Sequence, residues 1–156
     1  MTMPALFENH RETLQTSVVV MIEHVLAELG HVPDDTRVFD GDALSEWRVR
    51  QGSAEVSISI VEHEAGPRLR VRSAVMVLPP MVNRAAAYAH LLALNLELCG
   101  AAFACIDRQV LLTVERPLRD LDRSEVEDLV RGIPALADEH DDDLVAQFGG
   151  ALGGQI

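Results

Sequence analysis

Three short runs in which apolar residues occupy every second position constrain the fold of this chain more than any other feature of its sequence. The runs cover about 47–50, 54–60 and 68–77, and mostly charged or hydroxyl side chains fill the positions between the apolar ones. Turn residues at 51–53 and 64–67 separate them. Because successive side chains of a strand point to opposite faces, this alternation predicts an antiparallel meander with one apolar and one polar face.

Helical patterns flank the meander on both sides. Apolar residues over 14–29 recur at intervals of three and four, which predicts a helix that ends at Gly30. After the prolines that stop the third strand, a second helix is expected over about 81–98. A third helical region begins after Asp122, which is placed to cap it.

A further hairpin, with strands at 102–106 and 110–115, lies between the second and third helices. Gly132 and Pro134 should kink or split the last helical region near its middle. The element order is therefore α-β-β-β-α-β-β-α. This order predicts an α+β fold in which helices pack on an antiparallel sheet.

The length of 156 residues suits one domain with its own core. We expect a single domain over 1–156, with its core at about 9–148 and a frayed, glycine-rich tail at 149–156. A net charge of −12 argues against binding to nucleic acids or to anionic membranes. No run approaches the ~20 apolar residues of a membrane span, and no signal segment is recognised, so we expect a soluble, cytoplasmic protein.

The predicted middle helix is apolar nearly all round. Its apolar positions are Val82, Ala85, Ala86, Ala89, Leu91, Leu92, Leu94, Leu96 and Leu98. A helix that packs one side on a sheet needs an apolar stripe on that side only. We therefore expect the second face of this helix to meet another protein layer.

No catalytic motif is recognised, and we expect no catalytic residue, no metal and no cofactor. His63-Glu64 begins like a zinc-protease motif, but Pro67 stands where the second histidine would fall. The acidic run 138–143 lacks the ligand spacing of a calcium loop and is interpreted as a solvated face. A small metal-dependent enzyme that uses His63 and Glu64, or the acidic run around His140, is kept as an alternative.

Arginines gather on the polar side of the meander, at 48 and 50 and at 68, 70 and 72. The simpler interpretation is that they pair across strands with Glu46, Glu55 and Glu62. The alternative is a basic stripe that binds an acidic or extended peptide. The acidity of the whole molecule favours pairing.

Several local motifs accompany this element order. Leu78-Pro79 opens the middle helix, residues 91–95 within it read Leu-Leu-Ala-Leu-Asn, and Ala102-Phe103 follows. Further along, Glu115-Arg116-Pro117-Leu118 spans the end of the last predicted strand. Together these features resemble the YbjN-type domain, which is related in fold to the small acidic chaperones of type III secretion (the Tir-chaperone type). The likeness spans about 14–148.

The resemblance implies a non-enzymatic chaperone or adaptor that acts as a homodimer and receives an extended segment of a client protein. The dimer would be built largely on the middle helix, and its expected contacts are Leu91, Leu92, Leu94 and Leu98. The expected client surface includes Val18, Ile22, Trp47, Arg48, Arg50 and Arg70. For each apolar residue, ordinary core packing is the competing interpretation. A regulatory module that only dimerises is a third hypothesis.

Overall fold

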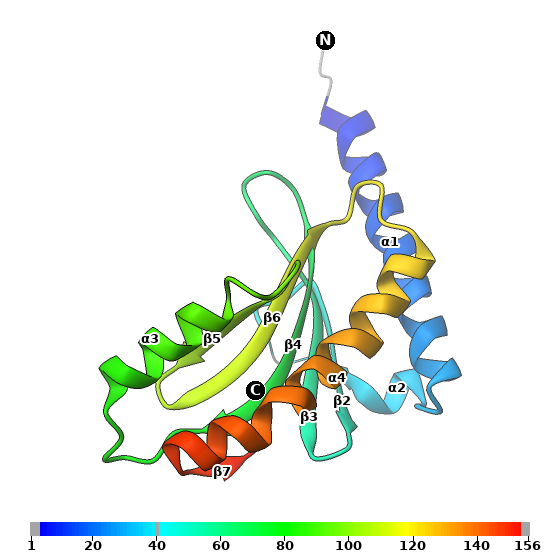
Figure 1. The fold of residues 1–156 in the computed structure, drawn as a ribbon. Coiled ribbons are helices and arrows are strands. Elements are labelled where there is room, and N and C mark those ends of the chain that lie inside the picture. Colours follow the sequence, from blue (N-terminus) through cyan, green and yellow to red (C-terminus); the bar gives the residue numbers. More distant parts are fainter. Residues whose placement is uncertain (1–3, 40, 154–156) are drawn as a thin grey trace.

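The computed structural model describes residues 4–39 and 41–153 of the chain, which form an α+β fold around one antiparallel sheet (Figure 1). The helices are α1 (Pro4–Glu28), α2 (Pro33–Thr36), α3 (Arg84–Leu94) and α4 (Arg123–Phe148). The strands are β1 (Arg37–Val38), β2 (Ser45–Gln51), β3 (Ala54–Val61), β4 (Arg68–Val77), β5 (Ala102–Ile106), β6 (Gln109–Pro117) and β7 (Ala151–Leu152). The predicted fold class and the order of the main elements are confirmed, and α2, β1 and β7 are short additions.

The strands lie in the order β1-β2-β3-β4-β6-β5, and every neighbouring pair is antiparallel. The predicted meander forms β2, β3 and β4, and its register places Ile58 between Trp47 and Val71. β6 rather than β5 pairs with β4, so β5 lies at an edge of the sheet. β7 extends the sheet beside the end of β4, where Met76 faces Leu152.

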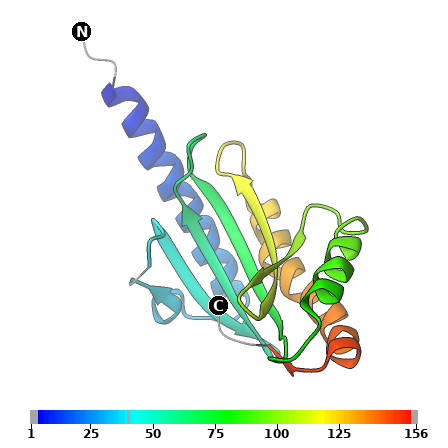
Figure 2. The same cartoon turned by 90° about the vertical axis from the view of Figure 1, so that its left-hand side faces the viewer.

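One face of the sheet forms the core, and α1 and α4 cover it (Figure 1). Trp47, Ile58 and Val71 of the sheet are fully buried in this layer, as are Ile22 of α1 and Val130 of α4. In Figure 2, β2, β3 and β4 lie in front of α1 and α4, and no helix of the described chain covers them. The alternation thus directs the apolar set toward the helices and the polar set toward solvent.

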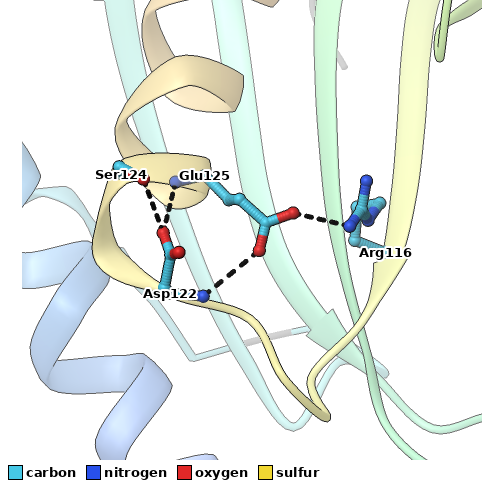
Figure 3. A network of polar contacts seen from close by, with 4 residues as sticks. All are labelled: Arg116, Asp122, Ser124 and Glu125. Carbon is cyan, nitrogen blue, oxygen red and sulfur yellow. Dashed lines mark hydrogen bonds and ion pairs between the residues drawn. The ribbon is translucent and has the colours of Figure 1, made fainter.

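α4 begins with a capping box that also fastens it to the sheet (Figure 3). The Glu125 N–H donates to the Asp122 carboxylate at 2.9 Å, and the Asp122 N–H donates to the Glu125 carboxylate at 3.3 Å. Arg116, near the end of β6, pairs with Glu125 at 2.6 Å. α4 then runs on as one helix through Gly132 and Pro134, so the predicted split into two helices does not occur. A proline removes one backbone hydrogen bond, and the packing of the buried inner face outweighs that loss.

The glycine-rich tail pairs with the sheet although its composition predicts fraying. The Gly153 N–H donates to the Val75 carbonyl oxygen at 3.0 Å, next to the β7–β4 pairing. Gly150 permits this close approach, because its φ is +95° and a Cβ there would lie 2.1 Å from the Val77 carbonyl oxygen. Residues 154–156 of the predicted tail lie outside the described residues.

Candidate functional site

The middle helix α3 leaves a row of apolar side chains uncovered. Its inner face is formed by Ala87 and Leu91, which are both buried. We use the name α3 stripe for the exposed residues at intervals of four, three and four, namely Ala85, Ala89, Leu92 and Leu96. The exposed fractions of Leu92 and Leu96 are 67% and 89%. The expectation that this segment carries more apolar surface than its own fold buries is confirmed.

The four leucines predicted at a dimer contact do not share one face. Leu91 packs in the core of its own protomer with 5% of its surface exposed, so it offers little surface to a second copy and its prediction at the dimer contact is wrong. Leu94 and Leu98 are half-buried against the core, and Leu92 belongs to the α3 stripe. The reason is helical geometry, because each residue turns about 100° from the last, so Leu91 lies on the inner side of the helix and Leu92 on its exposed side.

Asn95 lies at the end of α3 and connects it to the edge strand β5. Its Oδ1 accepts the Phe103 N–H at 2.7 Å, and its Nδ2 donates to the Phe103 carbonyl oxygen at 3.3 Å. One side chain thus occupies the outward backbone groups that a neighbouring strand would use. The helix predicted over 81–98 is shorter in the structure, because Asn83 caps its start and Asn95 turns to β5 at its end.

A groove of about 400 Å³ lies between α3 and β5. Tyr88, Leu92 and Asn95 line it from the helix side, and Phe103 and Cys105 line it from the strand. Burial raises the pKa of the Cys105 thiol, so this side chain contributes a neutral wall rather than a reactive thiolate. Since Leu92 belongs to both the groove and the α3 stripe, the two form one apolar area at this edge of the sheet.

Three apolar residues predicted on a client surface lie in the core instead. Val18 and Ile22 of α1 and Trp47 of β2 are each exposed by 1% or less. Their prediction as surface residues is therefore wrong, and the competing interpretation of core packing holds. The same periodicity marks a helix face that meets the sheet and one that meets a partner, so the pattern could not separate the two.

The arginines predicted on that surface lie on the helix-free face of the sheet, and most of them have carboxylate partners. Arg48 pairs with Glu46 of its own strand at 2.9 Å. Arg68 and Arg70 of β4 both pair with Glu115 of β6. Glu115 joins two arginines and so anchors β6 to β4 on this face.

The glutamates predicted as cross-strand partners behave differently from expectation. Glu62 pairs with Arg11 of α1 at 3.5 Å rather than with a strand arginine. Arg50 and Glu55 face each other in the β2–β3 register but form no ion pair within the described residues. Glu115 is not among the glutamates predicted to pair with these arginines. Alternation alone places it on the polar face, but only the β4–β6 pairing brings it to the arginines.

The residues of the alternative metal or catalytic sites do not converge. His63 and Glu64 lie in the turn between β3 and β4, where His63 Nδ1 accepts the Ala65 N–H at 3.1 Å. The His140 ring lies edge-on to Phe103, with centroids 5.4 Å apart. Among the described residues, no group of three or more His, Cys, Asp and Glu side chains is placed to hold a metal ion.

The acidic run 138–143 lies on α4, and one of its residues departs from the predicted solvated face. Asp141 is buried, with 7% of its surface exposed, whereas Asp138, Asp142 and Asp143 are exposed. Burial raises the pKa of Asp141.

Within the described chain, no helix, α4 included, has the length and apolar character needed to cross a membrane.

Two solved structures share this topology. The ExsC–ExsE complex matches with 13% identity over 83% of this chain and 94% of that chain, at a TM-score of 0.60. The heterodimeric ExoU–SpcU complex from the type III secretion system of Pseudomonas aeruginosa matches with 17% identity over 81% of this chain and 97% of that chain, at a TM-score of 0.53. At these identities the likeness shows the fold. A search of curated proteins finds no match.

A family model provides the sequence-level comparison. It is described as T3SS (YopN, CesT) and YbjN peptide-binding chaperone 1, and it matches residues 17–153. That range contains the α3 stripe, the groove beside β5 and the helix-free face of the sheet. The resemblance predicted from the sequence is confirmed, and the chain belongs to the family of T3SS (YopN, CesT) and YbjN peptide-binding chaperones.

Proposed function

We propose that this protein is a non-enzymatic chaperone or adaptor that works as a cytoplasmic homodimer and holds an extended segment of a client protein. The observation that carries the proposal is the α3 stripe, which places exposed leucines beside an edge strand. Family membership supports peptide binding. It favours neither a metal-dependent enzyme nor a module that only dimerises.

The α3 stripe suits a second copy of the chain because it is nearly free of charge. Over residues 81–100 the charged side chains are Arg84 and Glu97, which cancel, in a protein of net charge −12. Two copies that meet through this segment avoid most of the repulsion between their acidic surfaces. Burying Leu92 and Leu96 of each copy would contribute about 1.5–3 kcal/mol per side chain.

The client segment is proposed to lie on the helix-free face of the sheet. Arg48 faces Ser57 there and Arg70 faces Ser59, and Arg50 lies two residues further along β2 opposite Glu55. Guanidinium and hydroxyl groups can donate to the carbonyl and side-chain oxygens of an extended peptide. This surface therefore offers hydrogen bonds along its length, whereas the α3 stripe offers apolar contact.

Sedimentation equilibrium tests the homodimer. At micromolar concentration the wild type should have about twice the mass of one chain. The double variant Leu92→Asp with Leu96→Asp should be monomeric, because it places four carboxylates in the apolar contact. Val20→Asp on α1 is the matched control, since Val20 is an exposed apolar residue outside the stripe. A monomeric wild type, or a dimer that the double change leaves intact, would contradict the proposal.

Site-specific photo-crosslinking in cells tests the client surface. A benzoylphenylalanine placed at Arg48, on the helix-free face, should form a discrete adduct with a client chain. The same residue at Glu139, which is exposed on the outer side of α4, is the control and should not. Adducts at both positions, or at neither, would argue against a client segment on this face.

A further inference from the structure

One arginine of the helix-free face is half-buried and has no carboxylate partner. Arg48, Arg68 and Arg70 all form ion pairs, as described above. Arg72 forms none within the described part of the chain, and its Nε is buried without a hydrogen-bond partner. A buried guanidinium N–H that lacks an acceptor is unfavourable, and a ligand that supplies an acceptor removes that penalty.

The register of the sheet leaves room above this side chain. Arg72 of β4 lies between Ser57 of β3 and Thr113 of β6, in one row across the strands. Arg48 of β2 follows Ser57 in the same row. The two immediate neighbours are short, and Arg72 lines two hollows of the surface.

The surroundings of Arg72 disfavour an uncompensated positive charge. Burial lowers the pKa of Arg72, and the nearby charge of Arg70 lowers it further. The carboxylates of Glu115 and Glu46 oppose this shift, but each already accepts hydrogen bonds from another arginine. Arg72 stays charged at neutral pH and so attracts an additional anionic group.

Two hollows meet at Arg72. One, of about 380 Å³, is lined by Asp42, Ala43, Glu46, Arg48, Ser57, Ser59, Val61, Glu62, Arg70 and Arg72. Of its acidic residues, Glu46 and Glu62 are paired with Arg48 and Arg11. The other hollow, of about 410 Å³, is lined by Arg72, Val77, Ile106, Asp107, Arg108, Gln109 and Leu111, so apolar side chains share it with polar and charged ones.

The residue rows of this face are spaced like alternate residues of a strand. Arg72 faces Thr113, and Ala74, two residues further along β4, faces Leu111. Two residues of extended chain span about 6.6 Å. An extended peptide that runs along β4 would therefore present every second side chain to successive rows of this face.

We propose that Arg72 is the anchor of a carboxylate-binding site, which receives an acidic side chain of an extended peptide while an apolar residue two positions away enters the hollow beside Leu111. The inference rests on the proposed chaperone function and specifies which segment of a client is preferred. The helix-free face would thus prefer a peptide in which an acidic residue and an apolar residue are separated by one intervening residue, in either order.

The test is an NMR titration of the isotope-labelled full chain with two synthetic peptides. Each is an eight-residue serine–threonine peptide with leucine at its sixth position, and the fourth position is glutamate in one and glutamine in the other. The glutamate peptide should bind about tenfold tighter, since hydrogen bonds to charged groups are the stronger ones. Saturation should shift the Arg72 Nε–Hε signal.

Variants distinguish binding of the peptide carboxylate at Arg72 from a general attraction between arginines and negatively charged peptides. Arg72→Gln should abolish the discrimination between the two peptides, and Arg72→Lys should retain part of it. Arg119→Gln removes the same charge from an exposed arginine of the β6–α4 connection that lines neither hollow, so it should leave the discrimination unchanged.

Three results would overturn the inference. Equal affinity of the wild type for both peptides, or an equal loss in Arg119→Gln and Arg72→Gln, would leave peptide binding intact but exclude a carboxylate site at Arg72. Absence of binding by either peptide would exclude the site as well. The crosslinking at Arg48 and the sedimentation of the dimer then decide separately whether the proposed function stands.

Discussion

α3 and α4 both carry apolar side chains at helical spacing, yet the fold treats them differently. α4 lies across the middle of the sheet and buries a full stripe, formed by Val126, Val130, Ile133, Ala137 and Leu144. α3 lies beside the edge strand β5 and buries only Ala87 and Leu91. The difference teaches that an apolar helix face becomes core or partner surface according to how much sheet remains to receive it.

The largest expected effect comes from placing a charge on the inner face of α4. Val130→Asp buries a carboxylate without a partner and should lower the free energy of unfolding by more than about 4 kcal/mol. Leu92→Asp on α3, measured by urea unfolding at concentrations that favour monomers, should change it by less than about 0.5 kcal/mol. Similar losses for the two variants would mean that the two helix faces are equally part of the core.

The next effect concerns the attachment of α3 to the sheet. Asn95→Ala removes both hydrogen bonds to Phe103 and should lower the free energy of unfolding by about 2 kcal/mol. Hydrogen exchange at the Phe103 amide should accelerate at the same time. Asn95→Asp keeps an acceptor for the Phe103 N–H, so it should protect that amide better than alanine does. Unchanged exchange in the alanine variant would show that α3 is attached by other contacts.

A smaller effect is expected where the chain leaves α4. Gly150→Ala introduces a Cβ against the Val77 carbonyl at a positive φ, so β7 should detach from β4. The expected loss of stability is about 1–2 kcal/mol, with faster hydrogen exchange at Gly153. Gly52→Ala also has a positive φ but meets open space, and it should leave the Gly153 amide protected. Equal exchange in both variants would contradict the role of Gly150.

The smallest effect is a pH dependence on the inner side of α4. Burial raises the pKa of Asp141, so the folded state holds this proton more tightly than the unfolded chain does. The corresponding stability is present below the ordinary aspartate pKa of about 4 and is lost as pH rises through the raised folded value. Asp141→Asn should flatten this decline and stabilise the protein at neutral pH. Asp128→Asn, on an exposed position of α4, is the control.

An opposite slope at Asp141 would indicate that its ionised form has a partner in the folded state. Urea unfolding between mildly acidic and neutral pH distinguishes the two cases. Asp122 provides an internal reference, because the Glu125 N–H lowers the pKa of that capping carboxylate. Its contribution to stability is present above the ordinary aspartate pKa and disappears as pH falls through the lowered value.

The alternation of side chains was sufficient to predict β2, β3 and β4 and the two faces that they form. Apolar spacing likewise placed the three main helices and identified the surplus of apolar residues on α3. These features are local, because a strand alternates every residue and a helix repeats every 3.6 residues regardless of what lies nearby. Prediction from the sequence therefore succeeded for elements and faces.

Only the tertiary structure decided which faces meet and which side chains find partners. Trp47 became core because α1 and α4 cover the face of the sheet that carries it, and Arg70 met Glu115, 45 residues away, because β6 enters the sheet next to β4 ahead of β5. Among the residues that the structure describes, the same strand order left Arg72 without a carboxylate partner and Leu92 exposed. Such outcomes depend on the order of strands in space, which periodicity along the chain does not encode.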